Sequence, residues 1–127
     1  MTASSNTDTP GHRPSDPRRR LGDDGEQLAA VCYERAGYVV IARNWRCRNG
    51  ELDLVLRRDD TIVICEVKTR RSRRFGHPGE AVTSTKQRRI RQLAAAWLAA
   101  HDEHAPMIRF DVAAVEHGTV EVIEDAF

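Results

Sequence analysis

The chain has 127 residues, which suffices for one domain but is too short for two independent hydrophobic cores. Lys and Arg number 20 and Asp and Glu number 19, so the overall charge indicates no class of partner. No apolar run approaches the roughly 18–20 residues of a membrane span, and the N-terminus carries no hydrophobic signal segment. Three cysteines without a C-x-x-C pair are typical of a reducing compartment. These features predict a cytoplasmic protein that does not enter a membrane.

Residues 1–20 are rich in Thr, Ser, Pro, Gly and Arg and show no apolar periodicity, which predicts a disordered N-terminal tail before a single domain at 21–127. The first helix is expected to begin near Asp23 or Asp24, because Asp23 and Glu26 have capping-box spacing. It should end at Gly37, a residue suited to the position after a helix.

Five runs have the length and apolar character of strands: 38–42, 51–56, 61–68, 107–115 and 119–123. Turn signals at Asn49-Gly50 and Asp59-Asp60 separate the first three. A second helix is expected from about Ser84 to Ala100, with Ser84 and Gln87 at capping-box spacing. The order α-β-β-β-α-β-β predicts an α/β domain, a mixed five-stranded sheet flanked by helices.

The strands around Asp59-Asp60 carry a group of charged residues. Alternate residues of a strand share a face, so Glu51 should point the same way as Asp53, and Glu66 the same way as Lys68. A two-residue turn pairs residues whose numbers sum to 119, which places Asp53 opposite Glu66 and Glu51 opposite Lys68. Opposed carboxylates about 5 Å apart repel each other unless a cation or proton separates them. Mg²⁺ or Mn²⁺ is the expected occupant.

Lys68 would then lie beside the metal, positioned to orient an attacking water or to stabilise charge on phosphorus. The alternative is a set of cross-strand ion pairs at a solvent-facing edge. Ile62 and Ile64 share the face of Glu66, so the charges adjoin an apolar surface where unpaired carboxylates are costly, and this favours a site. Glu26 remains open between a helix-capping role and a ligand role.

Basic residues are concentrated between Lys68 and Arg91, where nine basic residues accompany one acidic residue, Glu80. Such a surplus attracts nucleic-acid phosphates, although a solvated helix face next to a basic loop has the same composition. The residues expected to contact phosphates are Arg70, Arg71, Arg73, Arg74, Lys86 and Arg89.

Six motifs together resemble the YraN family of small bacterial proteins, in the same order and over about Leu21 to Phe127. The most specific is G-E-x-D-L followed by E-V-K-x-R on the next strand. The motifs are Gly25-Glu26 with Ala29, Gly37-Tyr38, Asn44-Trp45-Arg46, Gly50-Glu51-Leu52-Asp53-Leu54, Cys65-Glu66-Val67-Lys68-Thr69-Arg70 and Arg109-Phe110-Asp111-Val112.

The resemblance implies a restriction-endonuclease-like fold of the PD-(D/E)XK superfamily, related to archaeal Holliday-junction resolvases. No proline precedes Asp53, which departs from the pattern that names the superfamily. The resemblance further implies metal ligands at Asp53 and Glu66, a catalytic Lys68 and an accessory acid at Glu26, with Glu51 as a further candidate.

These features lead us to expect an endonuclease that depends on Mg²⁺ or Mn²⁺ and hydrolyses phosphodiester bonds of structured or branched DNA. A homodimer would suit a junction-cutting enzyme, which makes two incisions. The alternatives are a non-catalytic nucleic-acid-binding module with the same fold and a partner-binding scaffold whose charged group is structural.

Overall fold

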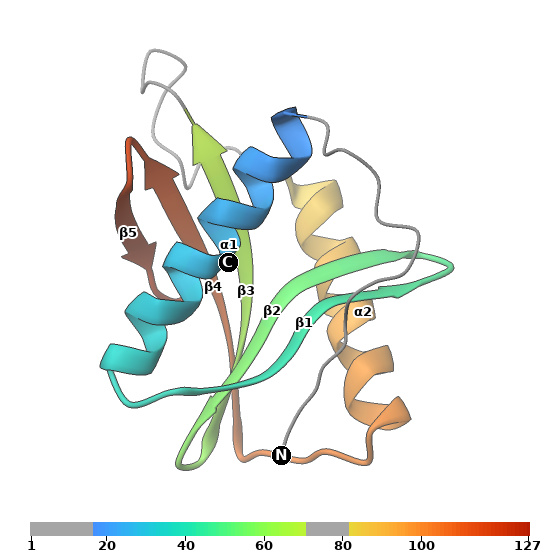
Figure 1. Cartoon of the computed structure of the whole chain (residues 1–127). Coiled ribbons are helices and arrows are strands. Elements are labelled where there is room, and N and C mark those ends of the chain that lie inside the picture. Colours follow the sequence, from blue (N-terminus) through green and yellow to red (C-terminus); the bar gives the residue numbers. More distant parts are fainter. Residues whose placement is uncertain (1–16, 71–81) are drawn as a thin grey trace, which may run out of the picture.

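The computed structural model describes residues 17–70 and 82–127, and over these residues it contains the predicted elements in the predicted order (Figure 1). The elements are α1 (Pro17–Arg35), β1 (Val39–Cys47), β2 (Gly50–Arg58), β3 (Thr61–Arg70), α2 (Ser84–Ala100), β4 (Met107–Glu116) and β5 (Thr119–Ile123). The predicted α/β class and mixed five-stranded sheet are confirmed. Most of the predicted tail, 1–16, lies outside the described residues, whereas residues 17–20, also predicted as tail, belong to α1.

The sheet has the order β1-β2-β3-β4-β5, in which β3 and β4 are parallel and the other neighbours are antiparallel. β3 is therefore central, as its apolar sequence predicts, and Ile62, Val63, Ile64 and Cys65 are at most 1% exposed. α2 follows β3 in the chain and leads to β4, the crossover that two parallel neighbours require.

The two helices cover opposite faces of the sheet, and β3 contributes alternate residues to both cores. Ile62 and Ile64 pack with the α2 residues Ile90, Leu93 and Trp97. Val63 and Cys65 pack on the other side with the α1 residues Ala29, Ala30 and Tyr33. Full burial of each aliphatic side chain contributes roughly 1.5–3 kcal/mol, so these two cores hold the layers together.

α1 begins at Pro17, earlier than the predicted start at Asp23 or Asp24. Proline is well suited to the first helical position because its φ is already helical and its missing N–H has no helical partner there. The predicted capping box is therefore wrong, since Asp23 and Glu26 lie inside the helix. The predicted end is confirmed: Gly37 has φ +93° and the Tyr38 N–H donates to the Tyr33 carbonyl at 3.0 Å.

α2 has the predicted bounds, but its N-cap is Thr83 rather than Ser84. The Thr83 hydroxyl accepts a hydrogen bond from the backbone N–H of Lys86 at 3.1 Å, and the Gln87 side chain donates to the Val82 carbonyl at 3.0 Å. This shift by one residue makes Lys86 the third residue of the helix, with its backbone fixed by the cap.

The first hairpin closes with Cys47 opposite Gly50, so its turn is Arg48-Asn49, one residue earlier than predicted. Gly50 has φ +143°, and a Cβ there would lie 3.2 Å from Cδ1 of Leu93 on α2. Glycine at this position therefore allows the hairpin to pack closely on α2.

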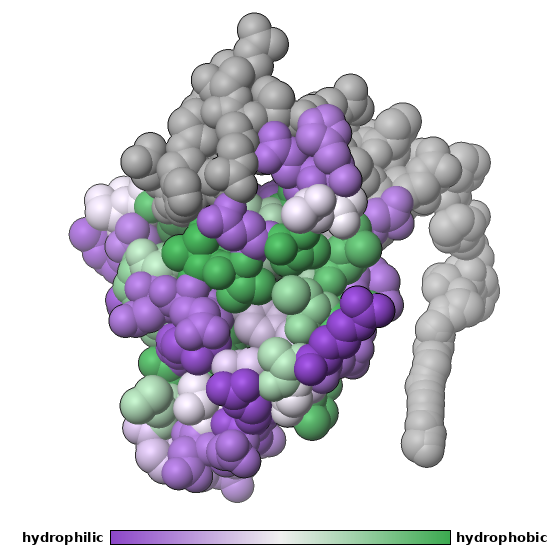
Figure 2. Space-filling view, turned by 90° about the vertical axis from the view of Figure 1, so that its left-hand side faces the viewer, coloured by the Kyte–Doolittle hydropathy of each residue, from purple (hydrophilic) through white to green (hydrophobic). Residues whose placement is uncertain are grey.

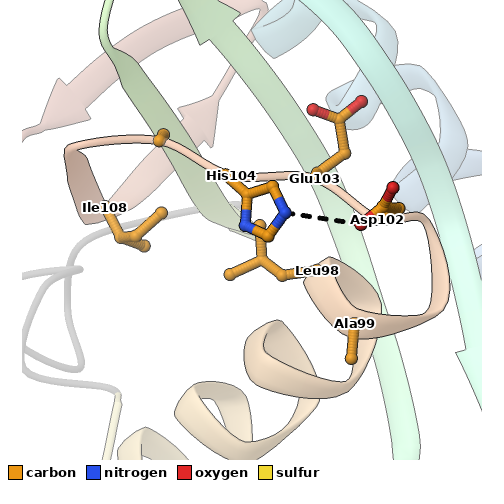
Figure 3. Close-up of a pocket in the computed structure, with 7 residues that line it drawn as sticks. Leu98, Ala99, Asp102, Glu103, His104 and Ile108 are labelled. Atoms are coloured by element: carbon orange, nitrogen blue, oxygen red, sulfur yellow. Dashed lines mark ion pairs between the residues drawn. The ribbon is translucent and has the colours of Figure 1, made fainter.

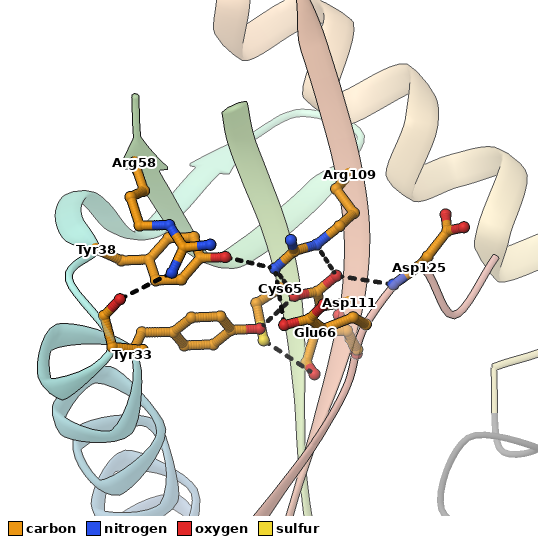
Figure 4. Close-up of polar contacts among 10 residues, drawn as sticks. Tyr33, Tyr38, Arg58, Cys65, Glu66, Arg109, Asp111 and Asp125 are labelled. Atoms are coloured by element: carbon orange, nitrogen blue, oxygen red, sulfur yellow. Dashed lines mark hydrogen bonds and ion pairs between the residues drawn. The ribbon is translucent and has the colours of Figure 1, made fainter. Parts of the chain in front are cut away.

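A buried polar network joins α1, β4 and the C-terminal segment (Figure 4). Asp111 is 0% exposed and accepts hydrogen bonds from the Tyr33 hydroxyl at 2.8 Å, Arg109 Nε at 2.9 Å and the Asp125 N–H at 3.0 Å. Its hydrogen bonds raise the pKa of Arg109, and burial raises the pKa of Tyr33. The network keeps α1 in a fixed position against the sheet, which determines where its N-terminal half lies.

On the side of the molecule that carries β5, hydrophobic residues gather in a patch bordered by hydrophilic ones (Figure 2). Val120 and Val122 of β5 are partly buried against the α1-side core, whereas Leu28 of α1 is 38% exposed. Neither helix within 17–70 and 82–127 combines the length and apolar character needed to cross a membrane.

Candidate functional site

β2 and β3 separate just before Asp53. Their ladder begins at Arg58 and Thr61 and ends at Leu54 and Cys65, whereas β3 remains paired with β4 as far as Arg70. Figure 1 shows β2 curving away from β3 beyond this point, with the N-terminal half of α1 in front of the diverging strands. The predicted register is confirmed for the five ladder pairs.

The predicted pairings of Asp53 with Glu66 and of Glu51 with Lys68 are wrong, because both positions lie beyond the end of the ladder. A register derived from a turn extends only as far as the strands stay adjacent. These four residues nevertheless lie on neighbouring strands, close to the point where the two strands part from each other.

β2 is also irregular at Asp53. Its pairing with β1 omits Asp53 and Asn44, and Asn44 has φ +50°, a left-handed conformation that asparagine tolerates. Leu52 and Val55 pack on the α2 side whereas Leu54 packs on the α1 side, although residues 52 and 54 of a regular strand share a face. The alternation of faces along β2 is therefore interrupted at Asp53.

A hydrogen bond ties Asp53 to β3 beyond the ladder. The Val67 N–H donates to Asp53 Oδ2 at 2.8 Å. The carboxylate thus replaces a backbone carbonyl as the partner of β3, and this fixes one of its oxygens while the other remains able to bind a ligand.

Three carboxylates gather at this point. One oxygen from each of Glu26, Glu51 and Asp53 lies within 4.8 Å of the others, and all three residues are half-buried. Glu26 is the tenth residue of α1, too far from the N-terminus to cap the helix, and its carboxylate lies beside the two acids of β2. Glu51 additionally forms an ion pair with Arg46, from Oε1 to Nε, at 3.3 Å.

Close packing of α1 on β3 brings Glu26 to this acidic triplet. A Cβ added to Gly25 would collide with the Thr69 hydroxyl oxygen, so the helix touches the strand at this residue. Glycine permits this approach, whereas any larger residue would force the Thr69 side chain or the helix to move. Glu26 follows directly and is held over β2 as a result.

Glu66 and Lys68 lie together on β3, as predicted from their alternate spacing. The nearest ionic partner of Glu66, however, is Lys86 of α2, which was not predicted. Glu66 Oε2 is 2.7 Å from Nζ of Lys86 on α2 and 4.0 Å from Nζ of Lys68. The Glu66 side chain is 11% exposed, so this lysine pair faces a largely desolvated carboxylate. Glu66 is not a member of the acidic triplet.

The electrostatics identify Asp53 as the centre of the site. Burial, followed by the negative charge of Glu66 and the smaller effects of Glu26 and Glu51, raises the pKa of Asp53 to about 7, although the Val67 hydrogen bond lowers it. Asp53 therefore changes protonation near neutral pH, and a cation among these acids would favour its ionised form.

The two lysines have opposite shifts. Burial lowers the pKa of Lys68, and its neighbour Lys86 lowers it further. Burial also lowers the pKa of Lys86, but the hydrogen bond to Glu66 and the charge of Glu66 outweigh burial and leave that pKa raised. Lys86 is thus the principal counter-ion of Glu66, and Lys68 is the less strongly held ammonium group.

The geometry of the triplet fits a hard divalent cation. Ligand oxygens about 2.1 Å from an octahedral Mg²⁺ or Mn²⁺ are separated by about 3.0 Å when adjacent and about 4.2 Å when opposite. Three carboxylate oxygens within 4.8 Å of one another are close to these separations. Asp53, Glu26 and Glu51 could hold such an ion, and Glu66 could join them from β3.

Of the residues expected to contact phosphates, Arg71, Arg73 and Arg74 lie outside the described residues, as does the side chain of Arg70. Lys86 contacts Glu66, as described above. Arg89 is exposed, and its Cδ lies 3.8 Å from the position of a Cβ on Gly50. Its stem therefore borders the end of β2 that carries the acids.

A hollow of about 310 Å³ lies at the other end of α2 and takes no part in this site (Figure 3). Within it, His104 Nε2 lies 3.3 Å from Asp102 Oδ1, and both side chains are almost fully exposed. The lining residues are Leu98, Ala99, Asp102, Glu103, His104, Ala105 and Ile108. A solvated ion pair of this kind contributes little to stability.

Sequence reasoning did not find the contact between Lys86 and Glu66. The one available signal was the position of Lys86 in the first turn of a predicted helix. A cation there faces the positive end of the helix dipole and therefore favours a nearby anion.

Comparison with known proteins gives a consistent match. The family model described as "Uncharacterised protein family UPF0102" matches residues 25–115, a range that includes every acid and lysine of the site. A UPF0102 protein of Beutenbergia cavernae is 57% identical over 95 residues, which cover 75% of this chain and 80% of the relative. A UPF0102 protein of Acidothermus cellulolyticus is 46% identical over 125 residues, covering 87% and 95%.

Proposed function

The chain belongs to the UPF0102 family, the YraN family of the sequence resemblance, and from this premise we propose that it is an endonuclease that depends on Mg²⁺ or Mn²⁺. Its substrate would be DNA, structured or branched. The observation that carries the proposal is the gathering of Glu26, Glu51 and Asp53 where β2 leaves β3, with Glu66 and Lys68 on the adjacent strand. Acids brought together at this energetic cost are more common at functional sites than in purely structural positions.

In this proposal Asp53 and Glu66 hold the metal, and Glu26 and Glu51 assist. The bound cation would supply Lewis acidity at a phosphate oxygen and a water of lowered pKa. Asp53 is oriented for this role by the Val67 N–H, which leaves its second oxygen directed to a ligand. The raised pKa of Asp53 means that ion binding would release a proton at neutral pH.

Lys68 provides the positive group next to the reacting phosphate. Its ammonium lies 4.0 Å from Glu66 Oε2 and is only partly buried, so it can reach an attacking water or a phosphate oxygen while it remains near the metal ligands. Charge that develops on the pentavalent phosphorus centre would be stabilised there by a donor already in position.

DNA would be held through its backbone. The candidates are Lys86 and Arg89 on α2, together with Arg70, Arg71, Arg73 and Arg74 at the end of β3 and beyond it. Contacts of lysine and arginine to phosphate fix register but read no bases, so the preference would be for DNA shape rather than sequence.

The test is cleavage of junction, flap and single-stranded DNA in Mg²⁺ and in Mn²⁺. We expect Asp53→Ala and Lys68→Ala each to lower the rate by at least about 100-fold with DNA binding retained, as for loss of a metal ligand or a positioned charge. Asp60→Ala removes an exposed acid at the turn between β2 and β3 and serves as the control. Unchanged cutting by both site variants would refute the proposal.

A second candidate is a nucleic-acid-binding module without catalysis. The ion pair of Lys86 with Glu66 favours it, because the ammonium already neutralises one of the two acids assigned to the metal. Binding of all three DNA structures without cutting in either metal would support this alternative.

A further inference from the structure

We propose that Lys86 couples DNA binding to metal binding by competing with the metal for Glu66. This inference rests on the proposed function and adds a control step to it. The geometry that suggests it is the 2.7 Å contact between Lys86 Nζ and Glu66 Oε2, the shortest ion pair at the site within the described residues. While this contact persists, Glu66 is directed to α2 rather than to the acidic triplet around Asp53.

The position of Lys86 suits a residue with two alternative partners. Its backbone is fixed by the Thr83 cap, but its side chain is 38% exposed, so the ammonium can move between Glu66 and the solvent. Glu66 is 11% exposed and has much less freedom. The mobile member of the pair is therefore the lysine, and the carboxylate is the fixed member that becomes available when the lysine leaves.

Occupation of Glu66 by both cations is unfavourable. An ammonium in direct contact with Oε2 would repel a divalent ion ligated by the same carboxylate, and Lys68, 4.0 Å away, already adds a positive charge. Glu66 can therefore join Asp53 as a metal ligand, with its charge no longer neutralised by the ammonium group, only after Lys86 has moved.

A DNA phosphate is the alternative partner that suits a lysine at this place. Arg89 lies three residues further along the same helix, so the two cations are neighbours on one helix surface and can contact one backbone segment. The N-terminus of α2 also favours a negative group. When a DNA phosphate pairs with Lys86, Glu66 is released and can bind the metal. By thermodynamic reciprocity, the bound metal then strengthens DNA binding.

The experiment measures Mn²⁺ affinity from the signal of unbound Mn²⁺ in electron paramagnetic resonance. Each protein is titrated with and without junction DNA whose backbone linkages cannot be hydrolysed, and the Mn²⁺ bound by this DNA alone is measured separately and subtracted. We expect DNA to raise the Mn²⁺ affinity of the wild type about tenfold, within the usual range of coupling between two sites. Lys86→Met should bind Mn²⁺ about tenfold more tightly without DNA and gain nothing further when DNA is added.

Two variants provide controls. Lys86→Arg keeps the charge and should keep the coupling. Arg88→Met removes an exposed charge from the same helix and should behave as the wild type. If Lys86→Met folds poorly, Lys86→Gln, with a polar side chain, serves in its place.

The outcomes separate this inference from the proposed function. Wild-type Mn²⁺ affinity and wild-type coupling in Lys86→Met would overturn the inference and leave the metal site standing. Failure of the wild type and all variants to bind Mn²⁺, with or without DNA, would overturn the proposed function together with the inference.

Discussion

Replacing Asp53 by Asn should stabilise the protein, and the gain should grow as the pH rises from 5 to 8. The pKa of Asp53 is about 7 in the folded protein, against an ordinary value of 3.8. Between these values the unfolded chain has lost its proton and the folded protein retains it. The folded state binds more protons in that window, so the free energy of unfolding falls as the pH rises from about 4 to 7. Asn has no such ionisation, yet its oxygen still accepts from Val67.

The size of the effect follows from the shift. Roughly 3 pH units at 1.36 kcal/mol each give an upper limit of about 4 kcal/mol for the penalty above pH 7. At pH 5 only about one unit of the shift has taken effect, so about two further units, or at most about 2.7 kcal/mol, should separate the difference between wild type and variant at pH 8 from that at pH 5. Such a change in the free energy of unfolding is equivalent to several degrees in Tm for a domain of this size.

The assay is urea denaturation at pH 5 and pH 8 in the presence of a chelator, with Asp60→Asn as the control on an exposed acid of the neighbouring turn. Mg²⁺ added at pH 8 should then stabilise the wild type and leave Asp53→Asn nearly unchanged, because the ion offsets the repulsion around the ionised Asp53. A difference between wild type and variant that is the same at both pH values would refute the reasoning.

Three further predictions concern the framework of the site. Gly25→Ala should displace α1 from Thr69, lower Mn²⁺ affinity and destabilise the fold by about 1–3 kcal/mol, and adding Thr69→Ala should restore part of both losses in a double-mutant cycle. Asp111→Ala should cost about 3–5 kcal/mol in chemical denaturation because it leaves the Arg109 guanidinium without its buried partner; a loss below about 1 kcal/mol would contradict this. Thr83→Ala should cost about 1 kcal/mol through the lost N-cap of α2, whereas Thr83→Ser should cost little.

The framework of the fold was predictable because its signals are local. The two-residue turn at Asp59-Asp60 determines the register of β2 and β3, and the period of the apolar residues determines the bounds of α2. Cys65 is buried, as its place in an apolar run indicates, and burial raises the pKa of its thiol. In each case neighbours along the chain carry the information.

The arrangement of the site was predictable only in part. The sequence indicated Glu51, Asp53, Glu66 and Lys68 as candidates. The pairing predicted for them, however, required both strands to remain regular. The left-handed conformation of Asn44 and the departure of β2 from β3 depend on packing between distant segments, so periodicity cannot show them. The same is true of Glu26, whose position depends on the contact of α1 with β3.

The start of α1 and the N-cap of α2 were predicted wrongly because the sequence offers two plausible signals at each. Asp23 and Glu26 have the spacing of a capping box, but Pro17 offers an equally good start, and α1 takes the earlier one. Ser84 and Thr83 are both good caps, and the helix uses Thr83 because its hydroxyl reaches the Lys86 N–H.

The most direct test of a metal site centred on Asp53 is a crystal structure of the protein grown with Mn²⁺, using anomalous scattering to locate the ion. We expect a peak about 2.1–2.2 Å from the free Asp53 oxygen, with at least one of Glu26, Glu51 and Glu66 as a further ligand. Mn²⁺ bound only at other acids, or no peak near Asp53 at a saturating concentration, would contradict the account.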